Sequence, residues 1–146
     1  PQGLYILTAA YETHVRAVMV SWVQQASFDP PMVVLALRKG RDIVPLLHDS
    51  HAFALCQIAK EDRLTLKKFA ERRRKKEEDP LQSLEIIHKV TGSPILTRAL
   101  SYLDCTLVRH VDIDSDHDLY VGQVVSGGLL HPGQVNVRLR ESGYKY

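Results

Sequence analysis

Several features are scarce in this sequence, and each scarcity excludes a class of protein. Two cysteines in 146 residues are too few for a secreted disulfide scaffold. No apolar run reaches the roughly 18 residues that a membrane-spanning helix needs, which excludes a membrane protein. A balance of 19 Lys and Arg against 17 Asp and Glu leaves a net charge of +2, too small for a dedicated nucleic-acid binder. With eight Gly and seven Pro, the chain is not a low-complexity sequence either, and its length predicts one globular domain over residues 1–146.

The two cysteines and the start of the chain indicate its setting. Cys56 and Cys105 both lie within apolar stretches, FALCQI and YLDCTLV, where free cysteine behaves as a small hydrophobic residue. We therefore expect two buried thiols and a reducing compartment. The chain begins PQGLYILTA, without an initiator Met or a signal segment, and a strand is already under way at Leu4. We expect a domain taken from a longer protein.

Most of the chain has the pattern of short strands. Seven segments rich in Val, Leu, Ile and aromatic residues are bounded by turn formers or charges, which is typical of strands. These segments are residues 4–9, 17–23, 32–38, 52–58, 102–111, 118–126 and 135–140. Seven strands in a chain of this length predict a mainly antiparallel barrel or sandwich.

Two segments predict helices. Residues 42–50 suit a short helix with Asp42 as its N-cap and Pro45 in its first turn. Residues 61–78 predict a longer helix that begins with two acidic residues and carries an apolar stripe at helical spacing. The basic run 72–76 lies in its second half, and acidic residues flank this run on both sides. A solvated helix end is therefore favoured over a docking surface, which stays the alternative.

Few of the motifs that carry chemistry are present. His48 and His51 have the spacing H-x-x-H, but no third ligand accompanies them, so we expect surface histidines and no metal site. The glycine-rich fingerprints of dinucleotide and P-loop sites are absent, and so is the G-x-S-x-G motif of many hydrolases. These absences exclude enzymes built on those motifs.

The segment 17–41 has the one pattern that suggests a ligand. It contains a strand, a polar loop at 24–27, an aromatic and proline-rich turn at 28–31, a second strand and a basic cluster at 38–41. Hydroxyl and amide groups along the loop and positive charge at the far end would suit a flat ligand with a phosphate tail. An ordinary strand pair with a basic cap explains the same residues, and the composition leaves both interpretations open.

The sequence resembles the flavin reductase domains that bind FMN on a split β-barrel, and the resemblance covers nearly the whole chain. Its strongest part is SWVQQASFDPP at residues 21–31, followed by a strand and a basic turn. Further matching segments are GLYILTA at 3–9, FAL at 53–55, GSPIL at 92–96, YLDC at 102–105, DH at 116–117, VGQV at 121–124 and RLRESGYKY at 138–146. The ending resembles one subgroup, the reductase domain fused to the C-terminus of flavodiiron oxygen reductases of phototrophs.

The resemblance implies a six-stranded antiparallel Greek-key barrel with a few short helices, and an FMN site near the interface of a homodimer or hetero-oligomer. It carries no certain catalytic residue, because hydride transfer from NADH or NADPH to the flavin uses the reactivity of the cofactors. His117 matches a histidine beside the flavin and the nicotinamide. The implied cofactor-binding residues are Met19, Val20, Ser21, Gln25, Ala26, Ser27, Arg38, Lys39, Gly40, Arg41 and Cys56, of which 38–41 would hold the phosphate.

The resemblance also implies a pathway for electrons, which would pass to flavodiiron core domains in the parent chain, in the cytoplasm or the chloroplast stroma. Met19 and Cys56 depart from the family pattern, in which a small polar residue and an asparagine are usual, and so do Val137 and Leu139, where the subgroup usually has histidines. These departures support an alternative: a non-catalytic barrel that serves dimerisation or docks an electron donor such as ferredoxin.

Overall fold

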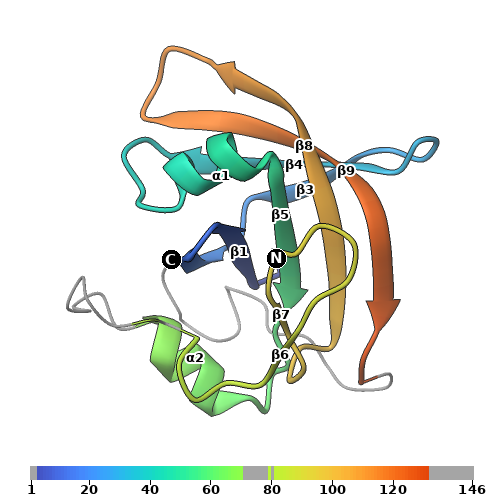
Figure 1. The fold of residues 1–146 in the computed structure, drawn as a ribbon. Coiled ribbons are helices and arrows are strands. Elements are labelled where there is room, and N and C mark those ends of the chain that lie inside the picture. Colours follow the sequence, from blue (N-terminus) through green and yellow to red (C-terminus); the bar gives the residue numbers. More distant parts are fainter. Residues whose placement is uncertain (1–2, 71–78, 80, 132–146) are drawn as a thin grey trace.

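The computed structural model of the chain describes residues 3–70, 79 and 81–131. Within them, one seven-stranded antiparallel sheet is joined by two helices and a two-stranded ribbon (Figure 1). The strands and helices are β1 (Tyr5–Tyr11), β2 (His14–Val20), β3 (Val23–Ser27), β4 (Met32–Arg38), α1 (Val44–Ser50), β5 (Ala52–Gln57), α2 (Arg63–Ala70), β6 (Ile86–Ile87), β7 (Ile95–Leu96), β8 (Ser101–Asp112) and β9 (His117–Leu129).

The order of strands in the sheet, β2-β1-β5-β8-β9-β4-β3, shows how the barrel closes. The two edge strands are β2 and β3, which are consecutive in the sequence and separated only by Ser21 and Trp22. A two-residue connection cannot reach across a flat sheet of seven strands, because neighbouring strands lie about 4.8 Å apart. The sheet therefore curls until its edges meet at these two residues, which we call the seam.

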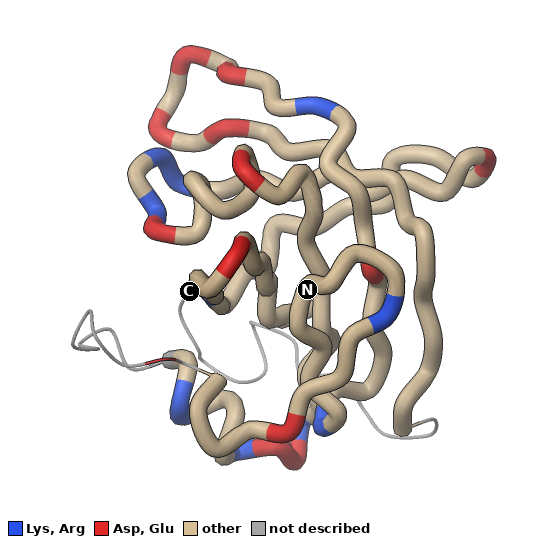
Figure 2. Tube along the Cα trace, viewed as in Figure 1, with Lys and Arg blue, Asp and Glu red and all other residues tan. Residues whose placement is uncertain are grey.

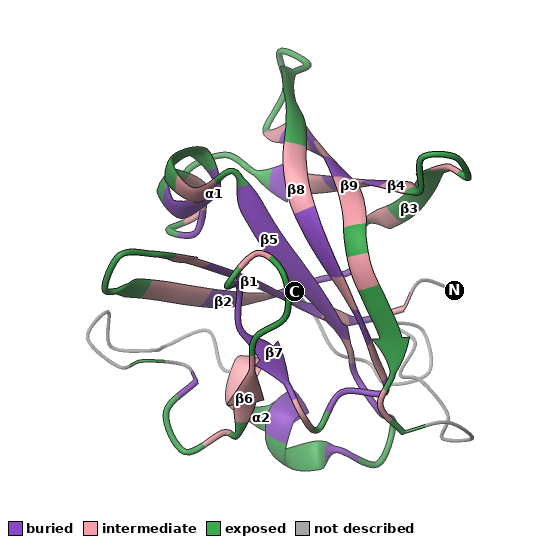
Figure 3. Cartoon of the chain, turned by 45° about the vertical axis from the view of Figure 1, so that its right-hand side comes forward, coloured by how far each residue is buried: buried purple, intermediate pink, exposed green. Residues whose placement is uncertain are grey.

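Strand β5 runs through the middle of the core and is buried on both faces (Figure 3). Phe53 and Leu55 point into the barrel, where residues of six strands and of α1 form one cluster, the inner core. Ala54 and Cys56 point outward into a second cluster, the outer core, which α2 and the segment 81–100 cover. Helices α1 and α2 thus belong to different layers, and they lie at opposite ends of the molecule in Figure 1.

The mainly β antiparallel class predicted from the sequence is confirmed, with differences in detail. The main sheet has seven strands among the described residues rather than six, because residues 24–27 belong to a strand and not to a polar loop. Their side chains gave no alternating pattern because β3 is an edge strand that pairs only with β4 and stays largely exposed. The ribbon β6–β7 was not predicted, and the strand expected at 135–140 lies outside the described residues.

Both predicted helices exist, but their ends differ from the prediction. Helix α1 begins at Val44 with Pro45 in its first turn, and its N-cap is Ile43, not Asp42. The Asp42 carboxylate instead lies 3.6 Å from the Arg16 guanidinium. Helix α2 is described from Arg63 to Ala70, and the basic run 72–76 lies outside the described residues.

Asp62 anchors the start of α2. Its carboxylate accepts hydrogen bonds from the Thr65 amide at 3.2 Å and the Thr65 hydroxyl at 2.6 Å, which is the geometry of an N-cap. The Arg98 side chain adds two hydrogen bonds of 2.7 and 3.2 Å to the same carboxylate. This pairing ties α2 to the segment that precedes β8.

The two cysteines are free and buried, as predicted. Burial raises the pKa of both thiols to about 12, so neither is a thiolate at neutral pH. Within the described residues, no helix has the length and apolar character needed to cross a membrane. The same part of the chain contains no group of three or more His, Cys, Asp and Glu placed to hold a metal ion.

Candidate functional site

The seam between β2 and β3 is a tight turn with an unsatisfied polar atom. The Val23 amide donates to the Ser21 carbonyl at 2.9 Å within the turn, and the Ala36 amide donates to the Trp22 carbonyl at 3.0 Å, which fixes Trp22 against β4. Ser21 is only 1% exposed, and its hydroxyl has no hydrogen-bond partner. An unpaired buried hydroxyl costs about 1–3 kcal/mol and is a feature that calls for a partner.

Trp22 and His117 form an aromatic pair at the seam. Their ring centroids lie 4.7 Å apart with a tilt of 37°. Nδ1 of His117 lies 2.9 Å from the Asp116 carboxylate, which orients the imidazole and lowers the pKa of Asp116. Arg38 pairs directly with His117 across β4 and β9, and its guanidinium lies 4.0 Å from Asp116. An aromatic surface and a cation therefore occupy one corner of the barrel.

The basic turn at 38–41 lies against the β8–β9 hairpin. Gly40 has φ of +81°, a conformation that glycine adopts without strain, so it allows the turn. The Lys39 amide donates to the Asp116 carbonyl at 2.9 Å, which joins the turn to the hairpin. Nζ of Lys39 lies 2.9 Å from the Asp112 carboxylate and 3.6 Å from that of Asp118. Figure 2 shows the acidic residues of the hairpin above the basic residues of the turn.

These contacts favour the charged form of both partners. The hydrogen bond to Asp112 is the main cause of a raised pKa of Lys39, and the same bond is the main cause of a lowered pKa of Asp112. Both groups therefore stay charged over a wider pH range than in a free chain. Arg41 behaves differently, because burial lowers its pKa and no carboxylate of the described residues lies within ion-pair distance of it.

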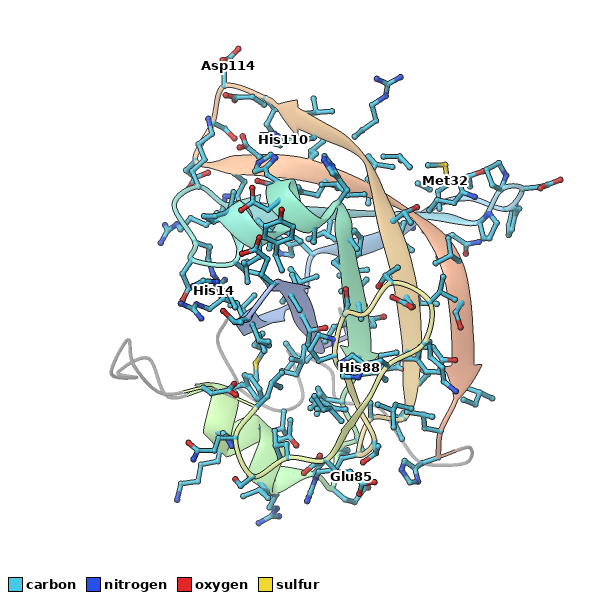
Figure 4. All side chains as sticks on the ribbon, in the orientation of Figure 1. His14, Met32, Glu85, His88, His110 and Asp114 are labelled. Carbon is cyan, nitrogen blue, oxygen red and sulfur yellow. The ribbon has the colours of Figure 1, made fainter. Side chains whose placement is uncertain are left out.

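A second aromatic cluster lies behind the hairpin, against α1. The His110 ring stacks on Tyr120 with centroids 4.7 Å apart and a tilt of 11°, and His48 of α1 meets its edge at 4.8 Å. Nε2 of His110 also lies 2.9 Å from Asp118. Figure 4 shows His110 at this end of the barrel. The cluster holds the Asp118 carboxylate in place beside Lys39.

The residues predicted to bind a cofactor fall into three environments. Met19 and Cys56 flank Ile6 in one row across the sheet, and both are buried in the outer core. Val20 is buried in the inner core, beside Ser21 of the seam. The third set is accessible to solvent at least in part: Gln25, Ala26, Ser27, Arg38, Lys39, Gly40 and Arg41.

The structure thus brings Ser21, His117 and the basic turn to one corner and leaves Met19 and Cys56 in the packed layer behind it. The sequence interpretation did not single out Trp22 as a site residue, nor the aspartates that pair with the turn. A signal for the aspartates was present, since Asp occupies every second position from 112 to 118. Residues at every second position of a strand lie on the same face, so this spacing indicates that carboxylates gather on one side of the hairpin.

Comparison with known families identifies the class of this domain. Residues 1–139 match the family described as the flavin reductase like domain. The chain therefore belongs to the flavin reductase like domain family, as its resemblance predicted.

Within that family the chain is similar to diflavin flavoproteins. It is 35% identical over 145 residues to diflavin flavoprotein A 1 of Synechocystis sp., which covers 99% of this chain and 25% of that protein. The chain spans about a quarter of the length of the curated relatives it matches. It is thus related to the reductase-like part of those longer proteins.

Solved structures with low sequence identity share the fold. The NADH:FAD oxidoreductase SgcE6 of Streptomyces globisporus C-1027 superposes with a TM-score of 0.83 at 18% identity, over 92% of this chain and 79% of that one. An FMN-binding protein from Thermus thermophilus superposes with a TM-score of 0.79 at 23% identity, over 88% and 71%. The split barrel is therefore the fold of this chain.

Proposed function

We propose that this domain is an NAD(P)H-dependent flavin oxidoreductase that binds FMN at the seam of the barrel. The observation that carries the proposal is the convergence of three features at one corner: the orphaned hydroxyl of Ser21, the ring pair of Trp22 and His117, and the basic turn 38–41. A flavin offers groups that fit each of them, namely hydrogen-bonding atoms on the ring edge and ribityl chain, a planar face and a phosphate. Family membership supports the same assignment.

The residues of the chain bind and orient in this proposal, and none transfers a proton. Bound FMN would supply the redox chemistry by accepting a hydride from NADH or NADPH at its N5 atom. Ser21 and the edge strand residues Gln25, Ala26 and Ser27 would line the ring and the ribityl chain. Arg38, Lys39, Gly40 and Arg41 would surround the phosphate, and His117 would lie beside the nicotinamide. Met19, Val20 and Cys56 would support this site from the packed core.

We further propose that electrons pass from this domain to flavodiiron core domains of a longer parent chain, in the cytoplasm or the chloroplast stroma. The diflavin flavoproteins to which the chain is similar are about four times its length, which leaves room for such domains. Two free, buried cysteines are in keeping with a reducing compartment.

A dimer through the outer face of β4 and β9 belongs to the same proposal. Val34 pairs with Val121, and Ala36 with Leu119, while the residues between them point into the inner core. These four apolar side chains are half-buried and continue directly to Arg38 and His117 on the same face. A second copy placed there would cover the apolar strip and lie next to the flavin. Light scattering after size exclusion would give twice the monomer mass, and a monomer at all concentrations would contradict this part.

Anaerobic absorbance spectroscopy of the 146-residue chain tests the main proposal. FMN is added first and NADPH or NADH second; we expect bound flavin after ultrafiltration and bleaching of its visible bands on addition of the nucleotide. Trp22 is the single tryptophan of the chain, so its fluorescence reports the seam directly. We expect FMN to quench this fluorescence at the concentrations at which it binds.

A non-catalytic barrel is the second candidate. It rests on the departures from the family pattern at Met19 and Cys56, where buried side chains of the outer core stand in place of groups that could hydrogen-bond a flavin. A chain that retains no flavin and leaves the Trp22 fluorescence unchanged would select this candidate. Salt-sensitive binding of ferredoxin by the same chain would then assign it to docking of an electron donor.

A further inference from the structure

The cations assigned to the flavin phosphate already have partners inside the chain. Lys39 lies between the carboxylates of Asp112 and Asp118, and Arg38 lies 4.0 Å from Asp116. Of the three cations in the turn, Arg41 alone has no such partner among the described residues. A phosphate that enters the turn would therefore meet one unpaired cation, Arg41, and two whose charge is partly compensated.

The pairing of Lys39 is built into the backbone of the hairpin. Asp112 and Asp118 are register partners at the end of the β8–β9 ladder, so their side chains lie on the same face. The Asp118 carboxylate is held by His110, and that of Asp112 accepts the Asp114 amide at 2.8 Å. Since the Lys39 amide is also bound to the hairpin, the turn and the two carboxylates are held together independently of any ligand.

Asp118 retains an unsatisfied atom in this arrangement. It is 8% exposed, and its Oδ1 has no hydrogen-bond partner, because Nζ of Lys39 is 3.6 Å away and bonded to Asp112. If a phosphate drew Lys39 out of the hairpin, both carboxylates would lose their cation. The gain from a phosphate contact is therefore offset by the loss of these contacts.

We propose that Asp112 and Asp118 determine the flavin specificity of this domain by competing with the flavin phosphate for Lys39. The inference rests on the proposed function and deepens it. The domain then recognises flavin mainly by its ring and ribityl chain, and it prefers FMN over riboflavin only weakly.

The test compares the dissociation constants of FMN and riboflavin, which differ only in the phosphate, for the wild-type chain and for Asp112→Asn. The wild type should prefer FMN over riboflavin by less than about tenfold. Asp112→Asn should tighten FMN by roughly two- to fivefold at low ionic strength and leave riboflavin unchanged. The amide oxygen of the variant can still accept the Asp114 amide, so the hairpin keeps its turn.

Asp114→Asn is the matched control. Asp114 lies at the tip of the same hairpin, pointing away from the barrel in Figure 4, with φ of +56°, which asparagine tolerates well. The substitution removes the same charge without touching Lys39, so FMN affinity should stay at the wild-type value. Combining Lys39→Gln with Asp112→Asn should abolish the gain, which assigns it to this lysine.

The outcomes distinguish failure of the competition for Lys39 from failure of the proposed function. Equal tightening by both hairpin variants, or a wild type that prefers FMN more than about tenfold, would overturn the competition and leave the proposed reductase intact. A chain that binds neither flavin, either as wild type or as Asp112→Asn, would overturn the proposed function as well. Unfolding midpoints close to wild type establish that each variant is folded in these measurements.

Discussion

Two regions of the β8–β9 ladder differ sharply although the same two strands form both. In its lower part, Cys105 is fully buried, and the Phe53 ring packs so closely on Gly122 that no side chain fits there. At its tip, Asp112 and Asp118 face each other around the amine of Lys39. The lower part contributes stability by excluding water, whereas the tip contributes charge that a ligand can reach. We therefore expect substitutions in the two regions to affect different measurements.

The largest loss of stability is expected for Gly122→Ala. The added methyl carbon would lie 2.4 Å from Cζ and 2.7 Å from Cε1 of Phe53, and 3.1 Å from Cβ of Cys105. Since the ring is fully buried and cannot move aside, we expect a loss of about 3 kcal/mol in the free energy of unfolding by urea. Phe53→Leu in the same chain should recover part of the loss. Gly40→Ala, where nothing lies within 4 Å but φ is +81°, should lose only about 1 kcal/mol.

Removal of the buried carboxylate of Asp104 is expected to have the next largest effect. It accepts the amides of Val90 at 2.8 Å and Thr91 at 3.0 Å, and also the Thr91 hydroxyl, so it fixes the loop that precedes β7. Asp104→Ala leaves these donors without a partner, and we expect a loss of about 2 kcal/mol. Asp104→Asn retains an acceptor oxygen and should lose clearly less. Equal losses in the two variants would show that hydrogen bonding does not stabilise this loop.

A smaller effect that depends on pH is expected at Asp62. Burial raises the pKa of this carboxyl, but hydrogen bonds from Arg98 and Thr65 outweigh it, so the pKa lies below its ordinary value of 3.8. A carboxyl whose pKa is lower in the folded state stabilises the fold at pH values above its pKa in the unfolded chain. This stabilisation is lost as the pH falls through the pKa of the folded state. Asp62→Asn should cost about 1 kcal/mol at neutral pH and flatten the decline of stability below about pH 4. Urea unfolding at several pH values measures this effect. If the free energy of unfolding of the variant fell with pH as steeply as that of the wild type, the prediction would be wrong.

The smallest effect on stability is expected for Lys39→Gln, at the tip. Exposed ion pairs contribute little to folding because water screens them, so the urea midpoint should not change measurably. The comparison between the regions would fail if this substitution destabilised the chain as much as Asp104→Ala does. Lys39→Gln should instead change the binding of flavin. Gly122→Ala should not change it, because Gly122 has no direct contact with the proposed flavin site.

The sequence analysis predicted the lower region better than the tip, for a physical reason. Strands such as 52–58 and 102–111 are recognisable by their apolar residues, because a buried strand needs such residues whichever strand it pairs with. Strand β3 escaped prediction because an exposed edge strand needs no such pattern. The error at Asp42 has a similar origin, since an N-cap is a local preference and Arg16 from a distant strand offers a competing partner.

The site was predictable only as far as the resemblance reached. Arg38, Lys39 and His117 were singled out, but a single sequence does not tell that β4 and β9 are neighbours in the register that pairs Arg38 with His117. The contact between Lys39 and Asp112 joins residues 73 positions apart and follows from that register. Trp22 was not singled out, because its contact with His117 depends on the fold and not on any local pattern.

The strand order also constrains how this domain forms during synthesis. Strands β8 and β9 lie between β5 and β4, so a growing chain that ends before them contains two separate sheets, β2-β1-β5 and β3–β4, each with an open edge. Strand β4 gains its second neighbour only when β9 has been synthesised, since Met32 of β4 pairs with Gln123 of β9. Pairing over such a distance in sequence slows folding, and the open edges expose backbone groups to other chains in the meantime. The hairpin that carries the acidic tip is therefore the last part of the described sheet to be synthesised, and the barrel cannot close before this hairpin has left the ribosome.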